Sequence, residues 1–357
     1  MSSSSVWSRR TMLRTLGAAT GAAFLGARKS EAAAPNGRVV INADGGAYEE
    51  AEAKAIYEPF TRETGIEVVR VPATATQVLA MVQSGSVQLD VLDNAEAQML
   101  MLDKQGALAP IDYDTFKYTN PMDLVPNIRR KTMCGNIYYA TVLGYSKRKF
   151  PNGGPKSWAD FWNTAKFPGS RSLESANAGL VPLEFALIAD GVALDKIYPV
   201  DIDRAFNVLS RLKPHVSKWW TTGAESIELL EGGEATAVGL WNGRIQGPID
   251  SGAPFGIEWN GAMRLKQFWG IIKNSPNAAN AQKFVDFALQ PHVQANLAKY
   301  IPYGPTNRKA VQYISKADLE KLPSSPQHYK VGFDEDAAWW TEHLQEVVLK
   351  WQRWLVS

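Results

Sequence analysis

The chain has 357 residues, of which 45% are hydrophobic and 21% are charged, with 38 Lys and Arg against 36 Asp and Glu. This composition is typical of a folded globular protein and excludes a collagen-like, coiled-coil or disordered chain. Because the length exceeds that of one compact core, we expect two domains. The single cysteine, Cys134, excludes an intramolecular disulfide framework.

The first 34 residues have the organisation of an export signal: a polar start, an apolar segment over 15–27, and small residues before residue 35. This apolar segment is too short to span a bilayer, which indicates a leader and not an anchor. The run SRRTMLR at 8–14, with Arg9 and Arg10, resembles the twin-arginine signal. An ordinary secretory leader is the alternative. Both predict a periplasmic protein whose signal peptide is cleaved within 30–36.

Without this leader the chain carries 33 basic and 35 acidic residues and has no basic block. A binding surface for nucleic acid needs concentrated positive charge. We therefore expect no nucleic-acid partner. No later apolar run approaches the length of a transmembrane span, so we expect no membrane anchor in the remaining chain.

Strands and helices alternate at the start of the remaining chain. Apolar runs and helical periodicity predict strands over 38–43, 66–71 and 89–93 and helices over 47–65, 74–85 and 95–106. This order indicates an α/β fold with parallel strands, in which ligands bind beyond the carboxyl ends of the strands. Asp44, Gly45 and Gly46 follow the first strand, and Asp93 and Asn94 end the third. We expect the two glycines to leave backbone N–H groups free for a ligand.

The composition changes around 147–163, where a second domain is expected to begin. Outside the leader, every tryptophan lies at or after Trp158. Ser157 and Asp160 predict a helix start, and Thr222 is expected to cap another helix. Further helices are predicted over 179–189 and 203–213, a strand over 136–146, a strand ending at Trp241, and an amphipathic helix over 334–355. That last helix is expected to pack on the second domain; a helix lying on a membrane is the alternative.

The sequence has no catalytic motif. Its four histidines, at 215, 292, 328 and 343, are scattered, and it has no H-E-x-x-H, C-x-x-C, G-x-S-x-G or P-loop pattern. We therefore expect neither an enzyme nor a cofactor or metal. A secreted enzyme that uses Asp93 or Glu258 is one alternative. A ferric-iron-binding protein that uses Tyr138 and Tyr139 is another, although neighbouring strand residues point to opposite faces.

Several segments resemble one known family. They are the leader, YEPFTRETGIEVVRV, QGALAPID, PKSWADFWNTAKFPGSRSL, LLEGGEATAVGLWNGRI and NSPNAANAQKFVDFALQPHVQANLAKYIPYGPTN. Together they are similar to the extracellular solute-binding proteins of ABC importers, in the spermidine/putrescine-binding branch. The resemblance implies a monomer that captures a small polar solute and delivers it to an inner-membrane ABC permease.

The same resemblance implies a two-lobed periplasmic-binding-protein fold of type II, with two crossover hinge strands and a ligand cleft between the lobes. The first lobe would comprise 37–142 and 268–312, and the second 143–267 and 313–357. In polyamine-binding relatives a tryptophan at the position of Trp241 stacks on the ligand, and Tyr303 matches a cleft tyrosine. The expected ligand-binding residues are Asp44, Gly46, Tyr48, Asp93, Asn94, Trp241, Asn242, Glu258, Gln267 and Tyr303.

Departures from this resemblance bear on the ligand. Polyamine binders hold each ammonium with carboxylates, but Gln267 occupies one acidic position of the family, and the segment ANAGLVPLE at 176–184 is apolar where relatives carry two acids. We therefore expect a cleft poor in carboxylates. Arg244, Arg264 and Lys266 lie near the same edge and permit a ligand with a carboxylate, such as an amino acid or an opine-like compound. Both a polyamine-like and an amino-acid-like solute remain open.

Overall fold

One mixed sheet of ten strands organises the computed structural model, which describes residues 37–42 and 45–357. The predicted leader and its cleavage site lie outside the described residues. The strand order is β2-β1-β3-β8-β4-β7-β5-β6, with β10 paired to β8 and β9 paired to β4. The strands are β1 (Arg38–Asn42), β2 (Glu67–Val71), β3 (Val91–Ala95), β4 (Met133–Ser146), β5 (Arg171–Glu174), β6 (Val216–Trp220), β7 (Ala237–Trp241), β8 (Phe255–Ile271), β9 (Gly304–Pro305) and β10 (Phe333–Asp334).

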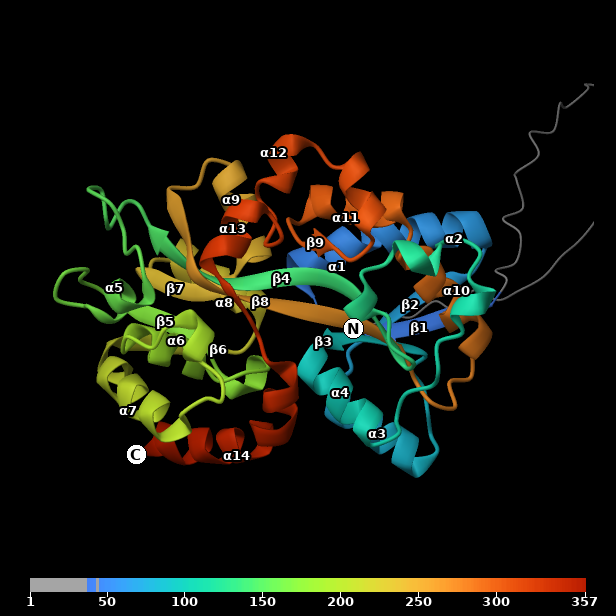
Figure 1. Cartoon of the computed structure of the whole chain (residues 1–357), viewed down its shortest axis with the longest axis horizontal. Coiled ribbons are helices and arrows are strands. Elements are labelled where there is room, and N and C mark those ends of the chain that lie inside the picture. The colour runs from blue at the N-terminus through green and yellow to red at the C-terminus, as the bar shows by residue number, and fades with distance from the viewer. Residues whose placement is uncertain (1–36, 43–44) are drawn as a thin grey trace, which may run out of the picture. The chain divides into compact units, whose positions relative to one another are not determined.

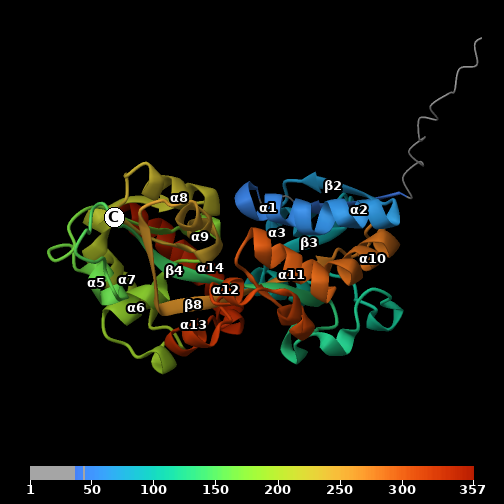
Figure 2. The same cartoon turned by 90° about the horizontal axis from the view of Figure 1, so that it is seen from above.

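Two long antiparallel strands join the two sides of this sheet. β4 and β8 pair from Met133 opposite Gly270 to Ser146 opposite Phe255. β1, β2 and β3 lie on one side of this pair and β5, β6 and β7 lie on the other, as Figures 1 and 2 show. We call the first group, with its helices, the first lobe and the second group the second lobe.

The expectation of parallel strands is correct only within each lobe. β1 pairs in parallel with β2 and β3, and β5 pairs in parallel with β6 and β7. The pairings of β3 with β8, β4 with β8, and β4 with β7 are antiparallel. The sheet is mixed because β8 returns from the second lobe beside β4 and β3, a long-range pairing that local periodicity does not encode.

The first-lobe helices follow the predicted boundaries closely. The predicted helix over 47–65 is one helical stretch that contains a π-helical turn, and it ends at Gly65 with φ of 70°. Only glycine adopts that left-handed conformation without strain. The elements are α1 (Gly46–Glu52), the π-helix η1 (Ala53–Tyr57), α2 (Glu58–Thr64), α3 (Ala75–Ser84), α4 (Glu96–Lys104), α10 (Ala278–Ala288) and α11 (Pro291–Tyr300).

The second-lobe helices begin at the predicted caps. The side chain of Ser157 accepts a hydrogen bond from the backbone N–H of Asp160, and that of Thr222 accepts one from Glu225. The helices are α5 (Trp158–Trp162), α6 (Leu183–Ala189), α7 (Ile202–Leu212), α8 (Gly223–Glu231) and α9 (Asn242–Asp250). α6 starts later than the predicted residue 179, because Pro182 is its N-cap and Gly179 has φ of 141°.

The C-terminal part of the chain contains α12 (Lys316–Leu319), α13 (Pro326–Val331) and the long helix α14 (Ala337–Val356). α14 packs on the second lobe, where Trp354 donates from Nε1 to Ser210 Oγ at 2.8 Å. It also contacts α4 of the first lobe, where Thr341 Oγ1 donates to the carbonyl of Ala97 at 3.1 Å. Among the helices of residues 37–42 and 45–357, none is long and apolar enough to cross a membrane.

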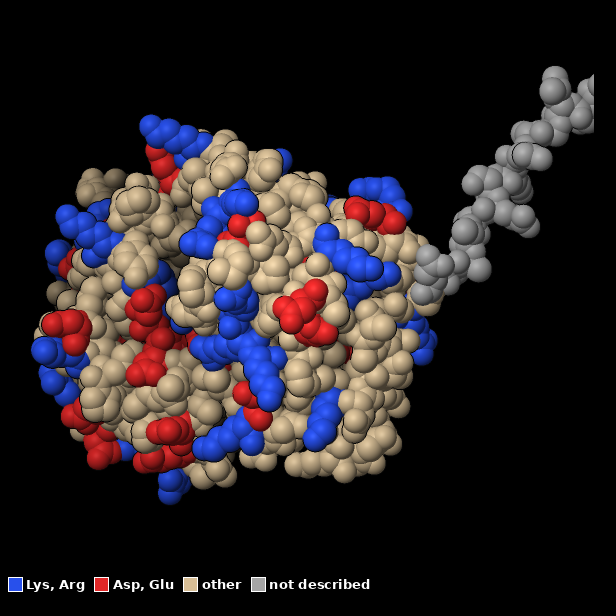
Figure 3. Space-filling view, turned by 45° about the vertical axis from the view of Figure 1, so that its right-hand side comes forward, with Lys and Arg blue, Asp and Glu red and all other residues tan. Residues whose placement is uncertain are grey.

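Seven short 3-10 turns connect the larger elements in the described chain. They are η2 (Tyr113–Thr115), η3 (Pro121–Asp123), η4 (Pro126–Ile128), η5 (Ala176–Ala178), η6 (Leu194–Lys196), η7 (Lys213–His215) and η8 (Arg308–Tyr313). Large aromatic side chains such as Trp158, Trp220 and Trp269 are fully buried beneath them, and Cys134 is a buried free thiol. On the face in Figure 3, basic and acidic side chains are interspersed with wide uncharged areas, in keeping with the nearly balanced charge of the sequence.

Candidate functional site

The carboxyl end of β3 carries a buried carboxyl group that several side chains hold in place. Tyr48 of α1 donates its hydroxyl to Asp93 Oδ2 at 2.6 Å, and Gln267 of β8 donates from Nε2 to the same oxygen at 2.8 Å. Asn136 of β4 donates to the Tyr48 hydroxyl at 2.9 Å. Asn42 brackets the backbone of Asp93, accepting from its N–H at 2.7 Å and donating to its carbonyl at 3.0 Å. We call these five residues the Asp93 network.

The Asp93 network is not a simple anionic counter-ion. Burial raises the pKa of Asp93 to about 7, against hydrogen bonds from Tyr48 and Gln267 that lower it. Near neutral pH the carboxyl group is therefore partly protonated. Hydrogen bonds with Asp93 and Asn136 fix the position of Tyr48. The network therefore chiefly orients an aromatic side chain that forms one wall of the candidate site.

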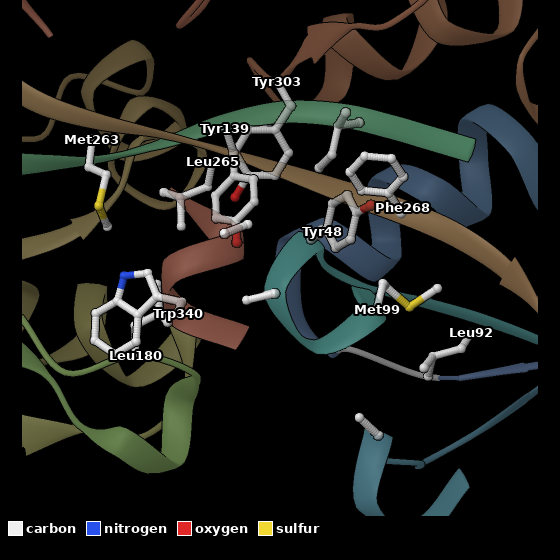
Figure 4. Close-up of a cluster of buried hydrophobic side chains, with 14 of the residues drawn as sticks. Tyr48, Leu92, Met99, Tyr139, Leu180, Met263, Leu265, Phe268, Tyr303 and Trp340 are labelled. Carbon is white, nitrogen blue, oxygen red and sulfur yellow. The ribbon is translucent and has the colours of Figure 1, made fainter. Parts of the chain in front are cut away.

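Aromatic side chains from both lobes form that wall. The rings of Tyr48 and Tyr303 lie 5.5 Å apart between centroids, and those of Tyr303 and Tyr139 lie 5.8 Å apart. Figure 4 shows these three tyrosines gathered beside β4. Trp241 at the end of β7 meets Tyr139 edge-on, with centroids 5.8 Å apart and an interplanar angle of 85°. The predicted residues Tyr48, Trp241 and Tyr303 are thus brought together.

Trp241 lies at the boundary between the core and the site. One side of its ring packs edge-on against the fully buried Trp220, at 5.3 Å between centroids. The residue itself is only partly buried, and its Nε1 has no hydrogen-bond partner within the described chain. An indole of this kind can offer one face and an N–H donor to a bound molecule.

Arg244, in the first turn of α9, is a buried cation beside Trp241. The residue is only 6% exposed, and its Nε and Nη1 have no hydrogen-bond partner among the residues described. Its Cζ lies 6.0 Å from the centroid of the Trp241 ring. A buried charge without a hydrogen-bond partner is costly, and a guanidinium in this state can donate to an anion.

Two glycines make room for Arg244. A Cβ atom on Gly46 would lie 2.9 Å from Arg244 Nη1, and one on Gly223 would lie 2.7 Å from Nε. Gly46 starts α1 of the first lobe and Gly223 starts α8 of the second. The guanidinium therefore lies where the two lobes meet. The predicted residue Gly46 belongs to the site through this close approach.

The other two predicted cations already have partners. Arg264 Nε donates to Asp334 Oδ1 at 2.7 Å, and Lys266 Nζ donates to Glu96 Oε2 at 2.9 Å. Among the three basic residues that the sequence placed near this edge, only Arg244 has unsatisfied buried donors. A carboxylate-bearing ligand would therefore meet Arg244.

Three further predicted residues make local contacts. Asn242 accepts from the N–H of Ala140 at 2.9 Å and donates to the carbonyl of Pro302 at 2.7 Å, so it ties β4 to the segment that carries Tyr303. Asn94 accepts from its neighbour Ala95 at 2.8 Å. Glu258 accepts from the N–H groups of two adjacent residues, on the second-lobe half of β8, where its partner on β4 is Leu143. The structure does not bring Glu258 to the other site residues.

Gly45 and Asp44 follow the end of β1, where the sequence predicted ligand contacts. The N–H of Gly45 is not free, because it donates to Glu49 Oε2 at 2.9 Å and so begins the helix. The expectation of a free N–H there was therefore wrong. Asp44 lies outside the described residues.

The expectation of a cleft poor in carboxylates stays a prediction, but three buried glutamates lie near the aromatic residues. They are Glu174 at the end of β5, Glu184 in α6 and Glu335 after β10; burial raises the pKa of Tyr139, and the charges of Glu335 and Glu174 raise it further. The sequence did not identify these glutamates as neighbours because they come from three separate elements. The only local signal was an acid within an otherwise apolar segment, as at Glu184.

The iron-binding alternative finds no support in the geometry. Tyr138 and Tyr139 are opposite Lys266 and Leu265 on β8, so their side chains leave opposite faces of the strand pair. Within residues 37–42 and 45–357, no group of three or more His, Cys, Asp or Glu side chains is placed to hold a metal ion.

Comparison with known proteins identifies relatives of the whole folded chain. Residues 55–326 match the family model described as "Bacterial extracellular solute-binding protein". The chain is 32% identical to the gamma-aminobutyric acid-binding protein of Pseudomonas aeruginosa, over 87% of this chain and 88% of that one. It is 26% identical to the spermidine/putrescine-binding periplasmic protein of Escherichia coli K12, over 73% and 76% of the two chains.

Among solved structures, the PBP AgtB from A. tumefaciens R10 in complex with agropinic acid superposes with a TM-score of 0.82. It is 34% identical and the match covers 90% of this chain and 99% of that one. These relatives are two-lobed solute-binding components of ABC transporters, and none is an enzyme by its description. The chain therefore belongs to the bacterial extracellular solute-binding proteins, which capture small solutes for ABC importers.

Proposed function

We propose that this protein binds a small solute that carries a carboxylate, and that Arg244 receives this group. The observation that carries the proposal is the pair of unpartnered guanidinium nitrogens, Nε and Nη1, on a residue that is 94% buried in the described structure. A carboxylate accepts charge-assisted hydrogen bonds from guanidinium N–H groups such as these. Trp241 would then lie beside the bound group.

This arrangement favours an amino-acid-like over a polyamine-like solute. A polyamine brings only positive charge, and Arg244 would repel it in a medium of low dielectric constant. The names of two relatives point the same way, since one binds gamma-aminobutyric acid and another was solved with agropinic acid. Both ligands are named as acids.

The placement of Arg244 suggests how capture proceeds. The Asp93 network belongs mainly to the first lobe and holds Tyr48 in place, whereas Arg244 and Trp241 come from the second lobe. A solute bound to one lobe would be enclosed when Arg244 approaches Gly46 across the interface. We infer that the two lobes close by bending β4 and β8, and that the closed complex delivers the solute to an inner-membrane permease.

A thermal-shift screen of the leader-free protein tests this proposal. Polyamines, amino acids, opines and simple organic acids are compared on the wild type, on Arg244→Gln and on Arg204→Gln, a control at an exposed arginine of α7. We expect carboxylate-bearing compounds to stabilise the wild type and the control but not Arg244→Gln. A strong shift with spermidine, or an unchanged response of Arg244→Gln, would contradict the proposal.

The competing class is a secreted enzyme. Incubation with a metabolite mixture, followed by denaturation and mass spectrometry, distinguishes the two. We expect the bound compound to be recovered chemically unchanged, in an amount that matches the protein. Accumulation of a product would instead favour the enzyme.

We also propose that the protein is exported by the twin-arginine route, loses its leader within 30–36, and acts as a monomer with lobes bounded near residues 142 and 268. The support for the route is the Arg9-Arg10 pair. Replacing both with lysine is expected to stop export. Normal export of that variant would indicate the general secretory route.

A further inference from the structure

Three buried glutamates remain unexplained by a carboxylate held at Arg244. Glu174 ends β5, Glu184 lies in the first turn of α6, and Glu335 follows β10. They are 5%, 0% and 7% exposed. We call these three residues the acid cluster. Glu335 is far along the sequence from Glu174 and Glu184, so the fold has brought it to them.

The strand register places Glu335 on the same face as Tyr139. In β10, Phe333 is opposite Met263 of β8, and Glu335 continues this pairing by donating its N–H to the carbonyl of Arg264 at 2.9 Å. Residues two apart on a strand share a face, so the Glu335 side chain points to the side of Phe333. Tyr139 belongs to that side too, because Leu265 is its partner on β8.

The carboxyl groups of this cluster have unused hydrogen-bonding capacity. Neither oxygen of Glu335 has a hydrogen-bond partner in the described part of the chain. Glu184 Oε1 accepts from Tyr198 at 2.7 Å and from Trp340 Nε1 at 2.6 Å, but its Oε2 has no partner there. Trp340 of α14 is fully buried in the cluster of side chains shown in Figure 4. Such buried oxygens are costly unless something else supplies donors.

The surroundings of Glu335 are also short of positive charge. Besides burial, Glu184 of α6, Glu96 of α4 and Glu174 of β5 raise the pKa of Glu335, and Lys266 of β8 lowers it. Lys266 is already paired with Glu96. Tyr139 of β4 and Tyr198, after α6, face the same groups and are uncharged.

Burial and this mutual repulsion favour the neutral acids. The pKa of Glu335 is well above its usual range, burial raises the pKa of Glu174 to about 8, and burial also raises the pKa of Glu184. In the solute-free protein at neutral pH the cluster therefore holds protons. A cation placed among these groups would stabilise their charged forms and release those protons.

We propose that the acid cluster, led by Glu335, binds a protonated amine of the solute. The solute would be a zwitterion whose carboxylate lies at Arg244 and whose carbon chain runs along Trp241 and Tyr139. This inference rests on the proposed function, because it takes the carboxylate at Arg244 as the other anchor. A neutral hydroxyl-rich group would fill the hydrogen bonds but leave the charge uncompensated, so it is the competing ligand class.

Isothermal titration calorimetry with two matched probe series tests this inference. One series is γ-aminobutyrate, δ-aminovalerate and ε-aminocaproate; the other is the hydroxy acids of the same lengths. We expect at least one amino acid to bind and its hydroxy analogue to bind about 10- to 100-fold more weakly, the size of a lost hydrogen bond to a charged group. Titrations in buffers of different ionisation enthalpy are expected to show proton release with the amino acid only.

Two variants test whether Glu335 is the residue that binds the amine. Glu335→Gln is expected to weaken binding of the amino acid about 10- to 100-fold, to remove most of the proton release, and to leave binding of the hydroxy acid unchanged. Glu346→Gln, on the exposed side of α14, is the matched control and should behave as wild type. Because Glu335→Gln removes a buried uncompensated acid, we expect it to fold and to melt at a higher temperature.

The outcomes separate this inference from the proposed function. Equal affinity for both series, binding of the hydroxy acids alone, binding of neither series, or an unaffected Glu335→Gln would each overturn the amine site. The carboxylate site at Arg244 would fail differently, through an Arg244→Gln variant that binds acids as the wild type does.

Discussion

Two arginines buried in the second lobe differ in what surrounds them. Arg171 on β5 is fully buried, and its guanidinium donates to the carbonyls of Phe161, at 2.7 Å, and Gly169, at 2.8 Å, and also to that of Phe167. Arg244 on α9 is almost as deeply buried but has two nitrogens without a partner in the described chain. The contacts of Arg171 stabilise the fold, whereas the unpartnered nitrogens of Arg244 support the proposal that it binds a ligand.

The same contrast applies to the buried acids. Asp93 has three donors on one oxygen, from Tyr48, Gln267 and Asn136, and so orients its neighbours. Glu335 has no hydrogen-bond partner on either oxygen among the described residues. Unpartnered buried polar groups lower stability, and this cost supports the proposals that Arg244 and Glu335 bind parts of a ligand.

The largest effect is expected from Arg171→Met. This variant leaves the carbonyls of Phe161, Phe167 and Gly169 without their donor and frees the segment around Phe167 from β5. We expect it to lower the free energy of unfolding by about 4 kcal/mol or more, measured by urea denaturation. The folded fraction should bind solute normally. A loss of less than about 1 kcal/mol would show that Arg171 is not a structural anchor.

Two tryptophans of the second lobe differ from each other in the same way as the two arginines. Trp220 is fully buried and donates to the carbonyl of Gly239 at 2.8 Å, whereas Trp241 is partly buried with an unpartnered Nε1 in the described structure. Trp220→Ala is expected to cost about 3–5 kcal/mol of stability. Trp241→Ala should cost less stability but remove about 1–3 kcal/mol of binding. Melting curves with and without ligand check both; equal destabilisation by the two variants would make Trp241 a core residue.

Two buried acids, Glu174 and Asp93, predict that the stability of the ligand-free protein depends on pH. The pKa values of Glu174, about 8, and Asp93, about 7, are higher in the folded state than in the unfolded chain, so the folded state binds protons more tightly. Stability is therefore highest at acid pH and falls as the pH rises through these values. We expect a loss of about 2–4 kcal/mol between about pH 5 and about pH 8, measured by urea denaturation.

Two controls bear on that pH dependence. Glu174→Gln should reduce the slope, since it removes one of the titrating groups. A saturating zwitterionic ligand should also flatten the pH dependence, because its bound ammonium group stabilises the charged carboxylates. Stability that rises over this pH range in the ligand-free protein would contradict the assignment.

The sequence predicted much of the fold because its signals were local. The caps at Ser157 and Thr222, the helix stop at Gly65 and the strand containing Tyr139 are all confirmed. The return of β8 was implied only by the family resemblance, through its two crossover strands, because pairing between segments that are distant in the sequence has no local signature.

The site was predicted in part, and for a physical reason. Resemblance to a family identified Trp241 and Tyr303, which the structure brings beside Tyr139 and Tyr48. It could not separate Arg244 from the paired cations or find Glu335. Whether a charge has a partner depends on side chains from other elements, so only the folded arrangement reveals it.

A double-mutant cycle between Arg244 and the carboxylate of the ligand measures whether these two groups interact. The affinities of γ-aminobutyrate and of its amide, which keeps the ammonium group but lacks the carboxylate charge, are measured by calorimetry on the wild type and on Arg244→Gln. We predict that the wild type prefers the acid by about 100-fold and that Arg244→Gln prefers it by less than about threefold, a coupling of about 2 kcal/mol or more. If both proteins preferred the acid over the amide to the same extent, the carboxylate would bind elsewhere, which would contradict the proposal that Arg244 receives it.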